Sequence, residues 1–169
     1  VPGIFADMVQ LANLLMHHRV TVMAIVPSVL HAYVESFPEP ALPASLRIVY
    51  VGGEAFPPSL ANKVMRLQSN VCVWDVYGPT EATIQSHGFV CKPNFSDHRV
   101  PIGRVLVNTT GYVIQGVPPP VGVAGELYLG GPKVARGYIG RPDLTDLAFV
   151  HLASLPDAGR LYKTGDRVR

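Results

Sequence analysis

The sequence of 169 residues has few cysteines and no long apolar run. Its two cysteines, Cys72 and Cys91, form neither a CxxC pair nor a set with histidines at metal-binding spacing. We therefore expect both to be reduced, structural thiols. The apolar runs stop short of the roughly 18 residues that a membrane helix needs, and residues 1–3 lack the charged start of a secretory signal. These absences predict a cytoplasmic protein with no membrane partner.

The sequence also lacks a strong charge of either sign. Its 14 basic and 12 acidic residues leave a formal net charge of +2, without a basic run, so nothing points to a nucleic-acid partner. A hydrophobic content of 48% is enough for a packed core in one domain or part of one. Because the chain starts without Met and ends on Arg169 after a polar turn, we expect an internal segment of a longer protein.

Residues 1 to about 90 alternate between helical and strand patterns. The spacing predicts helices over residues 3–18, 27–37 and 60–67, and strands over 20–26, 46–51 and 71–76. Strands that alternate with helices are typical of βαβ units. The fold class is therefore predicted to be α/β, with a mostly parallel sheet and flanking helices.

From about residue 91 to 169 the sequence becomes rich in Gly and Pro and predicts a smaller β-rich part. Residues 111–114 and 125–131 have strand patterns, and residues 83–90 before them are expected to be extended. Short helical turns are expected at 134–138 and 144–149, and a turn at 164–166.

Right-handed crossovers would bring the carboxyl ends of the three parallel strands to one edge, where open α/β sheets bind ligands. That edge would collect residues 25–28, 52–54 and 75–81. Gly52 and Gly53 either let backbone approach a flat ligand or form a tight turn with positive φ. The residues leave both interpretations open.

Thr80 and Glu81 place a hydroxyl beside a carboxylate, a pair that suits a phosphate and its Mg²⁺, although a capped turn would look the same. Tyr77 could stack on a base, and the carboxylate of Asp75 could accept hydrogen bonds from an amine. Asp166 could bind two adjacent ribose hydroxyls. Each of these residues also has a purely structural interpretation, and we assign no catalytic role to the histidines.

Four ordered motifs carry a family resemblance: LRIVYVGGEA at 46–55, YGPTE at 77–81, GELYLGG with VARGY over 125–138, and YKTGD at 162–166. They resemble the adenylation domains of nonribosomal peptide synthetases, members of the adenylate-forming superfamily. The resemblance covers essentially the whole chain. It implies ATP-dependent activation of a carboxylate, usually an amino acid, as an acyl-adenylate with release of pyrophosphate. The acyl group would then pass to the phosphopantetheine thiol of a peptidyl carrier protein domain.

The resemblance also implies residue roles. Thr80 would contact the α-phosphate, Glu81 would hold Mg²⁺, and Asp166 would bind the ribose. The adenine would be bound by Asp75, Tyr77 and the backbone of Gly52, Gly53 and Glu54, and Gly78 would be a further nucleotide-binding residue. The acid pocket would be lined by Ile25, Tyr50, Gly52, Val76, Ile84 and Gln85, which predicts a substrate with a neutral or hydrophobic side chain.

The sequence departs from the family pattern at two positions. Asp75 stands where the family most often has Asn, and Lys133 stands where Gly is common. Neither the Gly-rich phosphate loop nor the carboxy-terminal subdomain with its catalytic Lys is in the 169 residues, so we expect the isolated segment to be inactive. Two alternatives remain open: an acyl- or aryl-CoA ligase of the same superfamily, and a non-catalytic nucleotide-binding module.

Overall fold

The chain forms two compact units in the structure, a computed structural model that describes residues 7–37, 42–116, 118 and 120–169. The first unit comprises residues 1–76 and 88–103, and the second comprises residues 77–87 and 104–169. The chain therefore passes from one unit to the other three times, between residues 76 and 77, 87 and 88, and 103 and 104.

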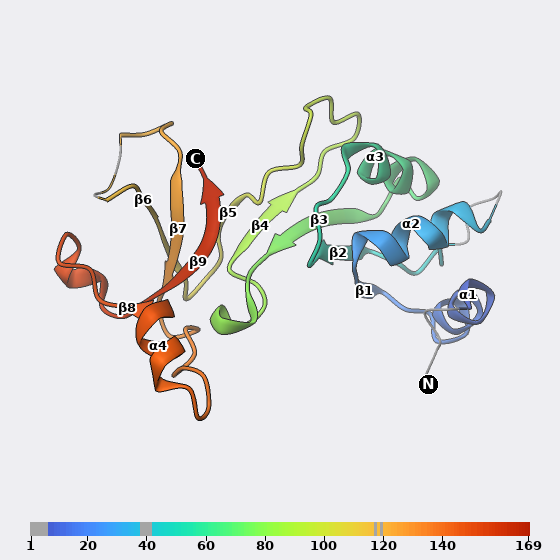
Figure 1. Ribbon diagram of the computed structural model, residues 1–169. Helices are drawn as coiled ribbons and strands as arrows, with labels where there is room; N and C mark the ends of the chain where they lie inside the picture. Colours follow the sequence, from blue (N-terminus) through green and yellow to red (C-terminus); the bar gives the residue numbers. More distant parts are fainter. Residues whose placement is uncertain (1–6, 38–41, 117, 119) are drawn as a thin grey trace. The chain divides into compact units, whose positions relative to one another are not determined.

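The first unit is an α/β layer built in chain order from α1 (Met8–His17), β1 (Val22–Ile25), α2 (Pro27–Glu35), β2 (Ile48–Gly52), α3 (Pro58–Leu67) and β3 (Cys72–Tyr77). The strands β1, β2 and β3 are parallel neighbours, with Ile25 beside Val51 and Val51 beside Asp75. β4 (His87–Val90) lies next to β3 and points the opposite way in Figure 1. The predicted α/β class is confirmed, and β4 makes the sheet mixed.

One face of this sheet is buried and the other is half exposed. Strand side chains alternate between faces, and the residues of one face join the three helices in a single hydrophobic core: Met23, Ile25, Val49, Val51 and Val73 from the strands, with Leu11, Leu30 and Val64 from the helices. The opposite face carries Tyr50 and Trp74, whose ring centroids lie 6.2 Å apart. The helices therefore cover the valine-rich face.

Local signals fix the helix starts. The Asp7 carboxylate accepts hydrogen bonds from the backbone N–H of Val9 and Gln10, which caps α1 at its N-terminus. The predicted helix over residues 3–18 is confirmed from Met8 onward, and residues 3–6 lie outside the described residues. Pro27 and Pro58 begin α2 and α3, where a missing N–H costs nothing.

The loop after β4 belongs to the first unit and is fixed by one side chain. The amide of Asn62 donates to the carbonyl of Phe95 at 2.8 Å and accepts from its N–H at 2.9 Å. Cys91 is buried in the core, and burial raises the pKa of its thiol to about 11. Both cysteines are free thiols.

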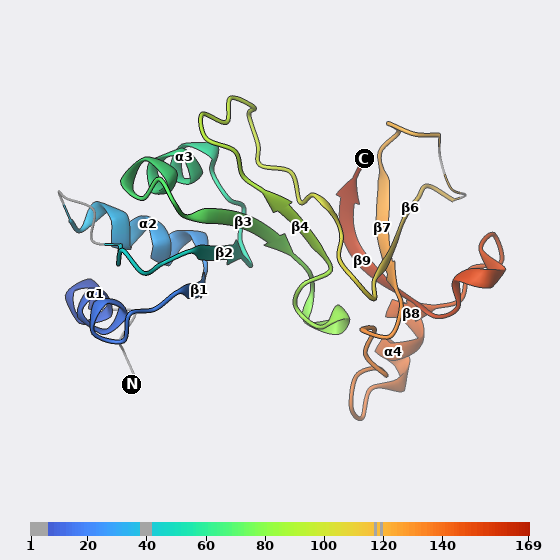
Figure 2. The ribbon, with the colours of Figure 1, turned by 180° about the vertical axis from the view of Figure 1, so that it is seen from behind.

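The second unit contains an antiparallel sheet in the order β6-β7-β9-β8. Its strands are β6 (Thr110–Ile114), β7 (Gly125–Gly130), β8 (Phe149–Val150) and β9 (Leu161–Val168), which Figure 2 shows from behind. The unit also contains the short strand β5 (Arg104–Val105), α4 (Pro142–Ala148) and the 3₁₀ turns η2 (Thr80–Ala82) and η3 (Pro156–Ala158). The predicted β-rich character of this part and the predicted strand at 111–114 are confirmed.

Three local predictions in this unit are wrong. Residues 135–138 are not helical, because the N–H of Ala135 bonds to the distant carbonyl of Glu81 at 2.7 Å instead of a neighbour. Residues 83–86 form a turn before β4 and are not extended. The segment 164–166 is a bulge inside β9, between the residues that pair with β7, and the side chains of Thr164 and Glu126 hold it there.

Within the described part of the chain, no helix combines the length and the hydrophobicity that a membrane crossing would require.

Candidate nucleotide site

The turn after β3 begins with Tyr77 and needs glycine at position 78. A Cβ on Gly78 would lie 2.6 Å from the carbonyl oxygen of Ile84 and 2.6 Å from the N–H nitrogen of Ser86. Pro79 then leads into η2, which presents Thr80 on the surface and Glu81 half buried. The second unit thus contains the whole YGPTE motif.

The structure brings Tyr77 and Asp166 together from opposite ends of the second unit's sequence. The phenolic hydroxyl of Tyr77 donates a short hydrogen bond to Oδ2 of Asp166. The two motifs YGPTE and YKTGD, 89 residues apart in the sequence at these positions, therefore meet side chain to side chain.

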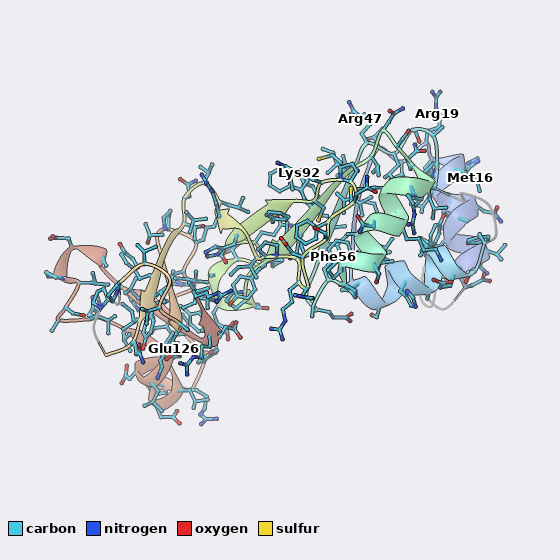
Figure 3. The ribbon with its side chains drawn as sticks, turned by 90° about the horizontal axis from the view of Figure 1, so that it is seen from above. Met16, Arg19, Arg47, Phe56, Lys92 and Glu126 are labelled. Atoms are coloured by element: carbon cyan, nitrogen blue, oxygen red, sulfur yellow. The ribbon has the colours of Figure 1, made fainter. Side chains whose placement is uncertain are left out.

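A bulge in β9 aims the Asp166 carboxylate. On β7 the pairing advances two residues, from Glu126 to Tyr128, while on β9 it moves four, from Arg167 to Lys163. Gly165 takes a positive φ of 79° in the extra segment. The Glu126 side chain, labelled in Figure 3, accepts the N–H of Gly165 at 2.9 Å. Bulges of this kind re-aim side chains next to active sites.

Thr164 completes the bulge. Its hydroxyl donates to the carbonyl of Leu127 at 2.8 Å and accepts the N–H of Asp166 at 3.0 Å. The side chains of Thr164 and Glu126 therefore bond to backbone groups that lose sheet partners in the bulge. Asp166 itself is exposed, so its carboxylate is open to a ligand.

His87 supports the ring of Tyr77. The two ring centroids lie 5.9 Å apart in an edge-to-face arrangement, and Nδ1 of His87 lies 3.0 Å from the hydroxyl of Ser86. Burial lowers the pKa of His87, so the ring is neutral at pH 7. Burial, followed by the bond to Asp166, raises the pKa of Tyr77 and keeps its hydroxyl a donor.

Glu81 is held by two contacts from the loop that follows β7. The hydroxyl of Tyr138 donates to Oε1 of Glu81 at 2.6 Å, and the carbonyl of Glu81 accepts the N–H of Ala135 at 2.7 Å. The bond from Tyr138 is the main reason that the pKa of Glu81 lies below its usual range. The carboxylate is therefore fixed and ionised at neutral pH.

The side chains behind Glu81 were assigned no role from the sequence. Phe149 lies between Tyr138 and Tyr162, with ring centroids 5.5 Å and 5.1 Å away. The guanidinium of Arg160 stacks on Phe149 at 4.6 Å and donates to the carbonyl of Ala135 at 2.8 Å. Tyr138 stands in the VARGY motif and was visible there as a motif residue, whereas Arg160 lies in no motif and had no signal.

The donor set at Glu81 fits a hard divalent cation that also binds phosphate. Among the described residues no three His, Cys, Asp or Glu side chains cluster as a metal site. Mg²⁺ typically takes one or two protein carboxylates and completes its shell with phosphate oxygens and water. One ionised, positioned Glu beside the hydroxyl of Thr80 meets that requirement.

The first unit contains the candidates that precede position 77. The carboxylate of Glu54 accepts the N–H of Ser28 at 3.0 Å and its hydroxyl at 2.8 Å, so the start of α2 and the loop after β2 do converge. Gly53 has φ of 86°, as the tight-turn interpretation of the glycine pair requires. A Cβ on Gly52 would lie 2.3 Å from the carbonyl oxygen of Val76, so Gly52 serves close strand packing.

Asp75 is 7% exposed and lies on the helix-covered face of β3. Burial raises its pKa to about 6. Ile25 belongs to the same face and to the hydrophobic core, whereas Tyr50, Gly52 and Val76 alternate onto the other face. The structure therefore places the pocket candidates Tyr50, Gly52 and Val76 on one face of the sheet and Ile25 on the opposite face.

Ile84 and Gln85, the remaining pocket candidates, lie in the second unit on the turn that follows η2. Thr83 and Ile84 both have positive φ, 59° and 66°. Ile84 is 68% exposed, and Gln85 is half buried. These two side chains are therefore presented by a backbone conformation that non-glycine residues rarely adopt.

Comparison with known proteins places these motifs in a family. The AMP-binding enzyme family matches residues 2–139. The chain is 35% identical over 168 residues to tyrocidine synthase 3 of Brevibacillus parabrevis, and this match covers 98% of the chain and 2% of that protein. It is 41% identical over 163 residues to phosphinothricin tripeptide synthetase PhsB of Streptomyces viridochromogenes, covering 94% of the chain and 13% of PhsB.

The fold agrees with solved structures. The chain superposes with a TM-score of 0.84 and 36% identity on holo-AB3403, a four-domain nonribosomal peptide synthetase bound to AMP and glycine, covering 96% of the chain and 12% of that protein. It superposes with a TM-score of 0.87 and 28% identity on FmoA3 in its α-methyl-L-serine-AMP bound form, covering 96% of the chain and 19% of FmoA3. The chain thus spans a small part of the proteins that it matches. It belongs to the AMP-binding enzyme family, and its nonribosomal peptide synthetase relatives confirm the resemblance that the four motifs predict.

Proposed function

We propose that the protein containing this chain activates an amino acid with ATP, forming an aminoacyl-adenylate and releasing pyrophosphate. The bond between Tyr77 and Asp166 carries the proposal. It joins a ring suited to stack on a base to a carboxylate suited to bind ribose hydroxyls. Glu81 and Thr80, in the same unit, supply the metal and phosphate contacts. The four side chains of Tyr77, Asp166, Thr80 and Glu81 thus suit the base, the ribose, the phosphate and the metal ion of one bound nucleotide.

The reaction is an in-line displacement. A carboxylate oxygen of the amino acid attacks the α-phosphorus, an oxygen–phosphorus bond forms, and the bond to the β-phosphate oxygen breaks as pyrophosphate leaves. Asp166 and Tyr77 orient the nucleoside, and the exposed hydroxyl of Thr80 donates to the α-phosphate. Glu81 would hold Mg²⁺, which supplies charge neutralisation on the phosphates when bound. Positioning and electrostatics provide most of the acceleration in such a step.

For the adenine we propose the groups of the first unit: the backbone of Gly52, Gly53 and Glu54, and the carboxylate of Asp75. Gly78 of the second unit is proposed as a nucleotide-binding residue. The amino-acid side chain is proposed to be neutral or hydrophobic. The candidates for its pocket are Tyr50, Gly52, Val76, Ile84 and Gln85, none of which is charged.

We further propose that the adenylate passes to the phosphopantetheine thiol of a peptidyl carrier domain in the cytoplasm, where ATP is available. The thiol loses its proton to solvent, its sulfur attacks the acyl carbon, and the carbon–sulfur bond of a thioester forms while the bond between the acyl carbon and the phosphate oxygen breaks and AMP leaves. PA1221, a structure containing adenylation and carrier domains, shares the fold of this chain with a TM-score of 0.87. The likeness at 23% identity concerns the fold alone.

The decisive experiment is amino-acid-dependent exchange of labelled pyrophosphate into ATP, measured on the full-length protein with the twenty amino acids. We expect exchange with one or a few neutral amino acids. A preference for Glu, Asp or Lys would contradict the pocket assignment. Hydroxamate formation with fatty or benzoic acids and none with amino acids would favour a CoA ligase, and no exchange at all would favour a non-catalytic nucleotide-binding module.

Two variants link this activity to the site. Glu81→Gln should lower exchange on the order of 100-fold, because a neutral amide replaces the metal-binding carboxylate. The matched control is Asp157→Asn, an equal loss of charge at an exposed residue of η3. Equal activity of the two variants would remove Glu81 from the mechanism.

A further inference from the structure

The turn after η2 holds an unusual backbone conformation. Thr83 and Ile84 are consecutive non-glycine residues with left-handed φ, and Ile84 is β-branched, for which such a φ is a genuine outlier. The N–H of Gln85 bonds to the carbonyl of Thr83 at 2.7 Å, which closes a tight three-residue turn. Conformations of this kind persist only where the surroundings enforce them, and they concentrate at functional sites.

Lys133 forms hydrogen bonds with this turn on both sides of Ile84. The hydroxyl of Thr83 donates to the carbonyl oxygen of Lys133 at 2.8 Å, and Nζ of Lys133 donates to the carbonyl oxygen of Gln85 at 3.0 Å. One residue thus binds the residue before Ile84 and the residue after it, once as an acceptor and once as a donor. We call this pair of bonds the Lys133 latch.

The backbone that carries Lys133 is itself fixed. The N–H of Ala135 bonds to the carbonyl of Glu81 at 2.7 Å. The guanidinium of Arg160 donates to the carbonyls of Ala135 at 2.8 Å and of Arg136 at 2.6 Å. The two bonds of Lys133 therefore connect the strained turn to a loop that is itself held in place.

The latch presents an apolar and an amide side chain in a defined orientation. Ile84 is 68% exposed in spite of the strain in its backbone. The ammonium of Lys133 donates to the backbone carbonyl of Gln85, so its hydrogen bond is directed to the turn. Such a surface suits a neutral aliphatic or aromatic group in a ligand.

We propose that Lys133 is a specificity-determining, positioning residue, whose latch fixes the orientation of Ile84 and Gln85 toward the neutral side chain of the activated amino acid. This inference rests on the proposed amino-acid activation. It predicts that loss of the latch weakens and broadens amino-acid selection and leaves the nucleotide contacts in place, because neither bond of the latch involves Tyr77 or Asp166.

The test uses the full-length protein with four variants. Lys133→Met keeps the length of the side chain and removes the donor, and Thr83→Val keeps the branched shape and removes the other donor. Lys133→Arg restores a donor. Lys92→Met, at an exposed residue of the first unit that Figure 3 labels, is the control for loss of a lysine.

For Lys133→Met and Thr83→Val we expect the KM for the preferred amino acid to rise roughly three- to tenfold, the range for one lost hydrogen bond. The KM for ATP and kcat should change less than about twofold, by the same scale. Discrimination against the next larger neutral amino acid should fall. Lys133→Arg should restore most of the wild-type KM and selectivity, and Lys92→Met should match the wild type. Hydrogen exchange at the amides of 83–85 should quicken in the first two variants only.

Two results would overturn the proposal separately from the proposed function. A wild-type protein that exchanges pyrophosphate, together with a Lys133→Met variant of unchanged amino-acid KM and selectivity, would refute the latch alone. An equal rise in the KM for ATP would assign Lys133 a general structural role. A wild-type protein without amino-acid-dependent exchange would refute the proposed function and the inference with it, and the source of failure would be evident from the wild type.

Discussion

Replacing Asp75 by Asn should stabilise the first unit at neutral and alkaline pH. Asp75 is 7% exposed on the core side of β3, and burial raises the pKa of its carboxyl from 3.8 to about 6. The N–H of Val76 bonds to the carboxylate and offsets part of this cost. An Asn side chain keeps an acceptor for that N–H and removes the buried charge.

The magnitude follows from the pKa. A shift of about two units corresponds to about 3 kcal/mol at 1.36 kcal/mol per unit. Above about pH 6 the carboxyl is ionised in both the folded and the unfolded state, so the folded state bears the full cost. As the pH falls from 6 toward 3.8, the folded state binds a proton that the unfolded state does not, and the cost disappears. The Asn amide needs a partner of its own, so we expect a net gain of about 1–3 kcal/mol at pH 8.

The assay is hydrogen exchange of peptides covering β2 and β3 in the full-length protein, with each variant compared to wild type at the same pH so that intrinsic exchange rates cancel. Asp75→Asn should slow exchange roughly 5- to 150-fold at pH 8 and have little effect at pH 4. Asp97→Asn, the same change at an exposed residue of this unit, should have no effect at either pH. Destabilisation at pH 8, or an equal gain at both pH values, would refute the argument.

Three further predictions concern single groups. Tyr138→Phe removes the donor to Glu81 and should raise the Mg²⁺ concentration for half-maximal pyrophosphate exchange about tenfold, the scale of a hydrogen bond to a charged group; an unchanged Mg²⁺ titration would contradict it. Tyr77→Phe frees Asp166 and should raise the KM for ATP roughly three- to tenfold with the amino-acid KM unchanged, whereas a rise in both would indicate general disruption. Gly103→Ala puts a Cβ 2.0 Å from a backbone carbonyl oxygen at φ of 84°, and should destabilise the first unit by at least about 2 kcal/mol in thermal unfolding; an unchanged melting temperature would contradict it.

The elements of the first unit could be predicted because their signals are local. Pro27 and Pro58 mark helix starts, and the short β-branched runs around Val49 and Val73 favour buried strands. The short-spaced alternation of the two then requires parallel pairing. The strand ends shifted by one or two residues, since the last hydrogen bonds of a strand depend on its neighbour.

Predictions failed where long-range bonds outweigh local preference. The segment 134–138 has a helix-compatible sequence, yet Ala135 gives its N–H to Glu81. The triplet 164–166 has the composition of a turn, yet it is a bulge within β9 because Thr164 and Glu126 satisfy the displaced backbone groups. No pattern in a short window contains these partners.

The sequence by itself determined the α/β class, the β-rich second part and the motifs that place the chain in its family. It identified Tyr77, Glu81 and Asp166 as candidates, because each residue type in its motif suits one part of a nucleotide. Only the tertiary structure decided that Tyr77 bonds to Asp166 and that Tyr138 fixes Glu81. Such contacts join residues tens of positions apart, and their existence depends on strand register and on bulges, which are settled by the packing of the whole unit.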